Sequence, residues 1–267
     1  MRRGIAVAAI VAGTLIPLLP LLVWAVAGSW RYPEVLPSRL TARGLRLLID
    51  PQSEVLTGLG TSVVIGLAVT ALALLVGVPA GRALGLYRFR GRRLVQFLLL
   101  APAIVPGVAA LLGTQVFFLR LGLADTVLGV VLVQLVPTVP YVTLVMSAAF
   151  GTYDVGYEAQ ARLLGAGPWR ALTHVTLPAL RPALAVAAFF AFLVSWSEYV
   201  LTLLIGGGVV KTLPLLLFSY ARGSDLTEAA AVALLLVAPP LVLVALLARD
   251  LVPGRDARGP VIGLGRL

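Results

Sequence analysis

Six long apolar stretches, almost free of charged side chains, divide this chain of 267 residues. A helix of about 20 apolar residues crosses the roughly 30 Å hydrocarbon core of a membrane. Every stretch reaches about this length, and only the fifth contains a charge, Glu198; the stretches are Ile5–Trp30, Val55–Gly81, Leu94–Leu119, Thr126–Tyr153, Pro182–Val210 and Ala229–Ala248. Because the alternating pattern of barrel strands is missing, helices are the expected spanning form. The sequence predicts an all-α integral membrane protein with six transmembrane helices.

Composition excludes several other classes of protein. The chain is 60% hydrophobic and only 12% charged, whereas a soluble domain carries about 25% charged residues. It contains no cysteine, which excludes disulfides, thiol catalysis and thiolate metal sites. The first apolar stretch follows a basic start, as in a signal peptide, but it is too long for a signal core. We therefore expect a retained first helix and a single transmembrane domain over residues 1–267.

Charged side chains are distributed unevenly between the two sides of the predicted membrane. With the N-terminus placed in the cytoplasm, the cytoplasmic segments hold fourteen basic and four acidic residues, and the external segments hold seven basic and six acidic residues. Cytoplasmic loops carry the excess of Arg and Lys in membrane proteins. The net charge of +10 therefore indicates topology, with both termini cytoplasmic, and does not indicate a nucleic-acid partner.

The apolar stretches and their flanks predict where helices and connections lie. Gly77, Gly81 and Gly85 are spaced by four residues, which lets the second helix approach a neighbour closely. An external segment is expected at 28–57, with a short surface helix within 38–49, and a cytoplasmic tail at 249–267. A re-entrant or external piece is expected at 209–226. The six helices are expected at 5–27, 58–84, 94–118, 126–149, 183–205 and 229–247.

The strongest positive cluster is the turn after the second helix, Tyr87–Arg93, which reads YRFRGRR. It fixes this loop as cytoplasmic under the positive-inside rule. Binding of anionic lipid is the functional alternative. At this level we interpret the cluster as a consequence of topology.

A polar segment between the fourth and fifth stretches carries the most specific pattern. Tyr157–Pro182 reads YEAQARLLGAGPWRALTHVTLPALRP. It resembles the cytoplasmic coupling loop of permease subunits of bacterial ABC importers, whose pattern is E-A-A, three residues, G, nine residues, I-x-L-P. Nine residues follow Gly165 before Val175, Thr176, Leu177 and Pro178. Ala159 stands where that pattern has its glutamate, and Glu158 lies one position earlier.

The resemblance implies a type I ABC-importer permease fold with its core at 56–247 and a coupling loop at 151–182. The chain would be a multi-pass subunit of the bacterial plasma (inner) membrane that forms the translocation path for a small polar solute. Its partners would be two ATPase subunits, a second permease subunit, identical or different, and a periplasmic or lipid-anchored solute-binding protein, besides membrane lipid. The residues expected to couple to the ATPase are Glu158, Ala159, Ala161, Arg162, Gly165, Leu177 and Pro178.

The roles of these residues follow their chemistry. A short helix at 157–164 would lie along the membrane, and Gly165 would permit the turn that ends it. Ala159 and Ala161 are small enough for close packing against the ATPase. Glu158 and Arg162, four apart, could pair with each other or with the partner. Leu177 and Pro178 would begin the next membrane helix, since proline suits a first helical turn.

Nothing in the chain predicts catalysis or a cofactor. A phosphate-binding loop needs a lysine directly after its last glycine, and in GGGVVKT, Gly206–Thr212, the lysine comes three residues later on the external side. ATP would thus be bound by the partner subunits. His174 is the only histidine and has no second ligand, so no metal site is predicted.

Glu198, in SWSEYV, is the only carboxylate within a predicted span. It is either a residue of the solute path that attracts a cation, or a structural carboxylate bonded to Ser195, Ser197 or Tyr199. The fifth-helix sequence and WRYPEVLP at Trp30–Pro37 resemble permeases of the polyamine, thiamine, phosphonate and iron group, which favours a polyamine-like solute.

Other transporter and enzyme classes remain as alternatives. A sugar or glycerol-phosphate importer shares the architecture. A stand-alone secondary transporter would need repeats and several polar midplane residues, and an intramembrane enzyme would need a catalytic cluster.

Overall fold

The computed structural model describes residues 13, 16, 18–30, 34, 37–104, 107–223 and 225–251. Helices dominate these residues, and a two-residue strand β2 (Arg39–Leu40) pairs antiparallel with β1 (Ala27–Ser29). The helices are α2 (Leu18–Ala25), α3 (Arg43–Leu47), η1 (Pro51–Ser53), α4 (Val55–Leu86), α5 (Arg92–Ile104), α6 (Gly107–Arg120), α7 (Val127–Gly151), α8 (Gly156–Leu163), α9 (Pro168–Ala171), η2 (Leu172–Thr176), α10 (Leu177–Ala179), α11 (Arg181–Trp196), α12 (Val200–Gly206), α13 (Leu213–Arg222) and α14 (Leu226–Leu251).

Three helices of the described residues are long and apolar enough to cross a membrane. They are α4, α7 and the Leu226–Leu247 part of α14. These confirm the second, fourth and sixth predicted helices. A fourth span arises if Pro168–Ala179 and Arg181–Trp196, which meet at 77°, are counted together. Of the first predicted helix, at 5–27, the structure describes residues 13, 16 and 18–27, which include α2, and the rest lies outside the described residues.

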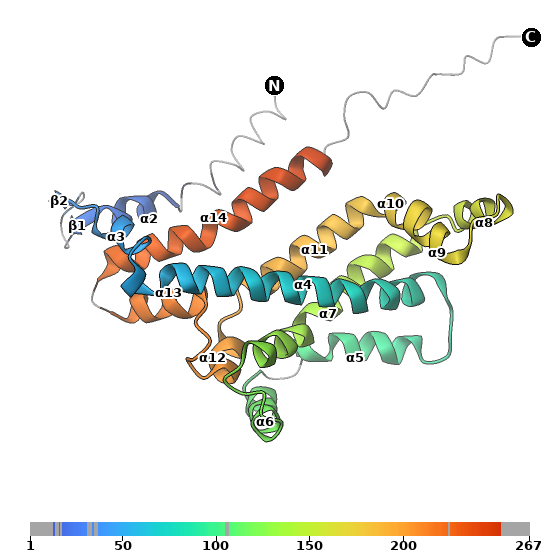
Figure 1. Ribbon diagram of the computed structural model, residues 1–267, viewed down its shortest axis with the longest axis horizontal. Coiled ribbons are helices and arrows are strands. Elements are labelled where there is room, and N and C mark those ends of the chain that lie inside the picture. The colour runs from blue at the N-terminus through green and yellow to red at the C-terminus, as the bar shows by residue number, and fades with distance from the viewer. Residues whose placement is uncertain are drawn as a thin grey trace, which may run out of the picture.

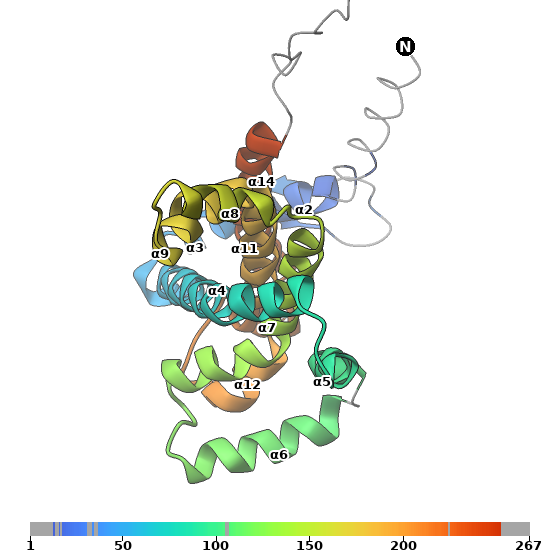
Figure 2. The same ribbon diagram turned by 90° about the vertical axis from the view of Figure 1, so that its right-hand side faces the viewer.

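The third and fifth predicted helices are each divided in two, which corrects the sequence analysis. The third, expected at 94–118, becomes α5 and α6. The two helices run in different directions: α5 is seen lengthwise in Figure 1 and end-on in Figure 2, whereas α6 is seen end-on in Figure 1 and lengthwise in Figure 2. The division falls within APAIVPG, Ala101–Gly107, whose two prolines lack the amide donor that a continuous helix needs. The fifth, expected at 183–205, ends at Trp196 and resumes at Val200. There the Ser197 hydroxyl donates to the Leu193 carbonyl at 2.8 Å, a bond that competes with the helical ladder.

The centre of the fold is the close packing of α4 against α7, with α11 beside both (Figure 1). A Cβ placed on Gly77, Gly81 or Gly85 would lie 2.5–2.6 Å from side-chain atoms of α7. The α7 residues concerned are Val142, Met146 and Phe150, all fully buried. The predicted glycine spacing thus serves a close helix–helix approach, as expected.

Connecting segments gather at two opposite ends of the helices (Figure 1). One end holds α8, α9 and the α4–α5 turn, which are the segments predicted to be cytoplasmic. The other holds the β1–β2 ribbon, α3 and α13, which are the segments predicted to be external. At that end the Thr227 hydroxyl donates to the Ala27 carbonyl at 2.6 Å, and Arg43 pairs with Asp225. The surface helix predicted within 38–49 is α3.

Candidate coupling site and solute path

Helix α8 is a separate short helix, as predicted, one residue earlier in the chain. Asp154 lies just before it, and its carboxylate accepts a hydrogen bond from the Gly156 amide, the first residue of α8, at 2.8 Å. Gly165 ends it with φ +86, in the left-handed region that favours glycine. The Gly165 and Ala166 amides donate back to Arg162 and Ala161 carbonyls at 3.0 Å. The turn that the sequence predicted at Gly165 is therefore present.

Glu158 lies inside this loop and does not face outward. Its side chain is 3% exposed, and one carboxylate oxygen accepts a hydrogen bond from the Thr176 hydroxyl at 2.7 Å. The other oxygen lies 2.7 Å from Arg82 Nη2 of α4 and 3.7 Å from Arg162 Nη2 of α8. A buried carboxylate needs such partners to offset the loss of water. Glu158 therefore ties α8 to both α4 and η2.

Arg82 is the site residue that the sequence analysis did not name. It lies near the end of α4, its guanidinium also stands 6.0 Å from the centre of the Phe150 ring, and its side chain is 23% exposed. The available sequence signal was a single charge directly after a long apolar run, at its predicted cytoplasmic end. The predicted Glu158–Arg162 pair exists, but it is the longer and more exposed of the two pairs.

The loop exposes several large apolar side chains. Leu163, Leu164 and Trp169 are 88%, 89% and 73% exposed, and Tyr157 is 54% exposed. Ala159 is exposed beside them, whereas Ala161 is half-buried. Contiguous exposed apolar side chains mark interaction surfaces. We call Tyr157, Leu163, Leu164 and Trp169 the loop patch.

Leu177 and Pro178 do not begin the long helix that follows, which corrects the prediction. They form the short α10, which continues from the π-helical turn η2. The chain then bends by 77°, and α11 begins at Arg181 with Pro182 in its first turn. A proline at the start of a helix needs no amide donor, and Pro182 meets that condition for α11. The loop from α8 to α10 is thus joined to α11 through a sharp bend.

Glu198 lies at the break between α11 and α12. Its carboxylate accepts a hydrogen bond from the Leu201 amide at 2.8 Å and so caps the first turn of α12. Neither predicted role describes this contact, since the partner is a backbone amide and not Ser195, Ser197 or Tyr199. The side chain is half-buried.

A buried polar network supports the same break. Gln134 of α7, 1% exposed, accepts a hydrogen bond from the Ser195 hydroxyl at 2.5 Å and donates to the Thr202 hydroxyl at 2.9 Å. Bonds of this kind between helices hold membrane proteins together. Sequence reasoning missed Gln134, although an uncharged amide in an otherwise apolar span was visible.

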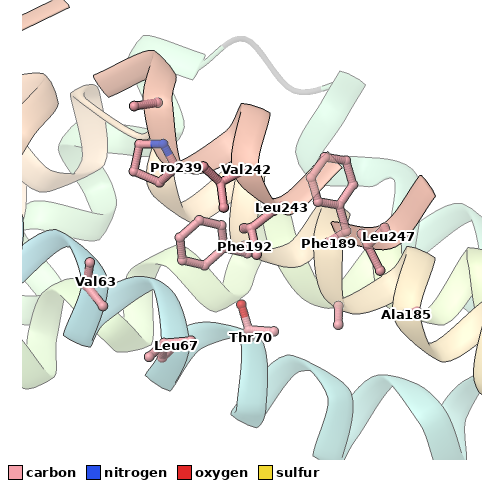
Figure 3. A pocket seen from close by; sticks show the side chains of 12 residues that line it. Val63, Leu67, Thr70, Ala185, Phe189, Phe192, Pro239, Val242, Leu243 and Leu247 are labelled. Atoms are coloured by element: carbon pink, nitrogen blue, oxygen red, sulfur yellow. The ribbon is translucent and has the colours of Figure 1, made fainter. Parts of the chain in front are cut away.

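An apolar cavity opens between α4, α11 and α14 (Figure 3). It encloses about 600 Å³ and is lined by carbon side chains such as Phe189, Phe192 and Leu243. Its one hydroxyl, on Thr70, donates to the Gly66 carbonyl of its own helix at 2.6 Å. Nothing in it offers a polar group to a polar solute.

Two other polar residues have local partners. Lys211 of the Gly206–Thr212 segment pairs with Glu54. His174 Nδ1 lies 2.8 Å from the Thr173 hydroxyl.

At the same end as Lys211, burial, followed by the charges of Glu228, Glu54 and Asp50, raises the pKa of Tyr220 above its usual 10.0. The Tyr220 hydroxyl accordingly stays protonated and donates to the Ser53 carbonyl at 3.2 Å.

Comparison with known proteins gives a family match over most of the chain. Residues 73–255 match the model of the binding-protein-dependent transport system inner membrane component. The molybdenum transport system permease protein ModB of Mycobacterium tuberculosis is 34% identical over 244 residues, covering 85% of this chain and 86% of the relative. The putative 2-aminoethylphosphonate transport system permease protein PhnV of Salmonella typhimurium is 29% identical, covering 92% and 95%.

One solved structure shows the same fold. It is the crystal structure of a bacterial ABC transporter involved in the import of the acidic polysaccharide alginate. A chain of that transporter matches with a TM-score of 0.70 at 19% identity, covering 94% of this chain and 95% of the other.

Proposed function

The chain belongs to the family of binding-protein-dependent transport system inner membrane components, and from this premise we propose how it couples solute passage to a separate ATPase. The observation that carries the proposal is the loop from α8 to α10. It presents an exposed apolar patch outward and a buried ion pair inward. The ATPase subunit docks on the loop patch, and the Glu158–Arg82 pair carries the motion of α8 into α4.

The bend before Arg181 gives the motion a second route. Thr176 is fully buried and bonded to Glu158, so η2 moves together with α8. Because α11 follows η2 and α10 across the bend, a shift of α8 also moves α11. Rigid displacement of packed helices is a common form of switching. Two helices that line the centre of the fold, α4 and α11, would therefore respond together.

The wider assembly follows from the family and the charge distribution. We propose six spans with both termini cytoplasmic, in the bacterial inner membrane. A second permease subunit, two ATPase subunits and an external solute-binding protein complete the importer. This chain carries no catalytic residue in the proposal, and ATP is bound by the ATPase subunits.

For the cargo, we propose a small charged solute and favour an oxyanion. The two relatives above are named for molybdenum and 2-aminoethylphosphonate transport. Glu198 caps α12 and is engaged with a backbone amide, so it gives little support to a cation site. A polyamine stays the alternative prediction. The test is ATPase stimulation in the reconstituted complex by molybdate, 2-aminoethylphosphonate, spermidine and maltose, each with the binding protein present.

Gly165 allows a sharp test of the coupling proposal. Its φ of +86 strains any β-branched side chain, although a Cβ there would meet nothing within 4 Å. We expect Gly165→Val to insert normally but to hydrolyse ATP without uptake. Gly165→Asn is the matched control, because asparagine tolerates the left-handed region. Normal uptake by Gly165→Val would contradict the proposal that this loop couples solute passage to the ATPase.

A further inference from the structure

The turn between α4 and α5 carries four arginines whose charges are not neutralised by neighbours. Arg88, Arg90, Arg92 and Arg93 make no ion pair with any acidic residue in the part of the chain that the structure describes. Residues 88–93 surround a hollow of about 480 Å³. Gly91, at φ +90, turns the chain so that these side chains share one small concave surface. The hollow is therefore a compact, strongly positive site.

An exposed apolar stripe begins directly after the arginines. Leu94, Phe97 and Leu98 of α5 are 61%, 59% and 58% exposed. Their spacing of three and four places them on one face of the helix. The stripe and the positive hollow are thus adjoining parts of one surface, with charge at one end and hydrocarbon at the other.

The position of this surface matches a membrane boundary. α4 has 32 residues and a length of roughly 48 Å, which exceeds the roughly 30 Å hydrocarbon layer. The turn follows its end, beside Tyr87 and Phe89, which are 57% and 42% exposed. Aromatic side chains are enriched at the level of lipid headgroups.

We propose that residues 88–98 form a binding site for an anionic phospholipid. The arginines hold the phosphodiester headgroup, since guanidinium groups donate paired hydrogen bonds to phosphate oxygens. One acyl chain lies along Leu94, Phe97 and Leu98. The charge favours a phospholipid over a helix of a second permease subunit, because an apolar helix would leave four guanidinium groups without counter-charges.

The test uses the purified complex of this chain with its partner subunits. Native mass spectrometry would follow titrations with phosphatidylglycerol and with phosphatidylcholine, with and without inorganic phosphate. We expect stronger binding of phosphatidylglycerol, retained in millimolar phosphate because the acyl chain also binds. Replacing all four arginines by glutamine should weaken phosphatidylglycerol binding by on the order of a hundredfold. Equal binding of both lipids by the wild type would overturn the proposal.

Two controls separate the site from general charge effects. Arg39→Gln/Arg46→Gln removes two exposed arginines at the opposite end of the fold and should leave lipid preference unchanged. Because loss of cytoplasmic arginines can invert a membrane protein, a variant with all four changed to lysine keeps the charge. It should weaken binding about tenfold by losing paired hydrogen bonds. Displacement of the lipid by phosphate alone would mean that the hollow takes free phosphate, and an unchanged affinity in the glutamine variant would also contradict the proposal.

Discussion

At the scale of single residues, the proposed coupling depends on one carboxylate with three partners. The sequence predicted that Glu158 matters and that Arg162 is near it, because residues four apart share a helix face. It could not predict Arg82, which is 76 residues away in the sequence and meets Glu158 through tertiary packing. It left open whether Glu158 pairs with Arg162 or with the ATPase, and in the structure the carboxylate is buried and bonded within this chain. Burial depends on tertiary packing, which local sequence patterns do not contain.

The two arginines around Glu158 provide an internal comparison. Arg82 is mostly buried, and its Nη2 lies 2.7 Å from the Glu158 carboxylate. The Arg162 side chain is 57% exposed, and its Nη2 lies 3.7 Å from the same carboxylate oxygen. We expect Arg82→Met to lower the free energy of unfolding by about 3 kcal/mol, because it leaves a buried carboxylate short of its main partner. Arg162→Met should cost less than about 0.5 kcal/mol. Thermal unfolding of the complex in detergent measures both.

Double variants with Glu158→Gln show whether the effect belongs to the pair. The interaction energy with Arg82 should be several-fold larger than the one with Arg162. Uptake per ATP hydrolysed should fall with Arg82→Met, since the motion of α8 is then less firmly transmitted to α4. Equal interaction energies for the two arginines would contradict the assignment of Arg82.

At the scale of elements, apolar length predicted the helices and failed at their breaks. α4, α7 and α14 each follow one uninterrupted apolar run. α7 continues through Pro137 and Pro140. Proline is tolerated inside a packed membrane helix because neighbouring groups satisfy the backbone carbonyls that lose their amide partners. The breaks depend on other interactions: Gln134 and Glu198 hold the α11–α12 break through polar contacts that apolar length does not measure. The bend before Arg181 is likewise invisible to hydropathy.

The α4–α7 contact can be tested with two glycines of the same helix. A Cβ on Gly81 would stand 2.6 Å from Met146 Cβ, whereas one on Gly60 would meet nothing within 4 Å. We expect Gly81→Leu to force α4 from α7 and to abolish assembly of the complex. Gly60→Leu should assemble normally, because its side chain points away from the core. Size-exclusion chromatography of the two variants compares them directly, and similar behaviour would refute the close packing.

At the scale of the whole molecule, the sequence predicted sidedness from charge alone. The structure places the predicted cytoplasmic segments, α8, α9 and the α4–α5 turn, at one end (Figure 1). It places α3 and α13, predicted to be external, at the other. The loop patch and the basic turn consequently share an end, so the ATPase and the lipid headgroup would be bound near each other. The first span is outside this comparison because its N-terminal part lies beyond the described residues.

The absence of cysteine makes the central claim directly measurable, since any introduced cysteine is unique in this chain. Leu163 of α8 is 88% exposed and Leu40 of β2 is 76% exposed, and these two elements lie at opposite ends of the fold (Figure 1). The measurement is photo-crosslinking from a benzophenone maleimide attached to the thiol of Leu163→Cys or Leu40→Cys, in membranes that contain the whole importer. We expect that Leu163→Cys crosslinks to the ATPase and that Leu40→Cys does not. A crosslink to the ATPase from Leu40→Cys, or none from Leu163→Cys, would contradict it.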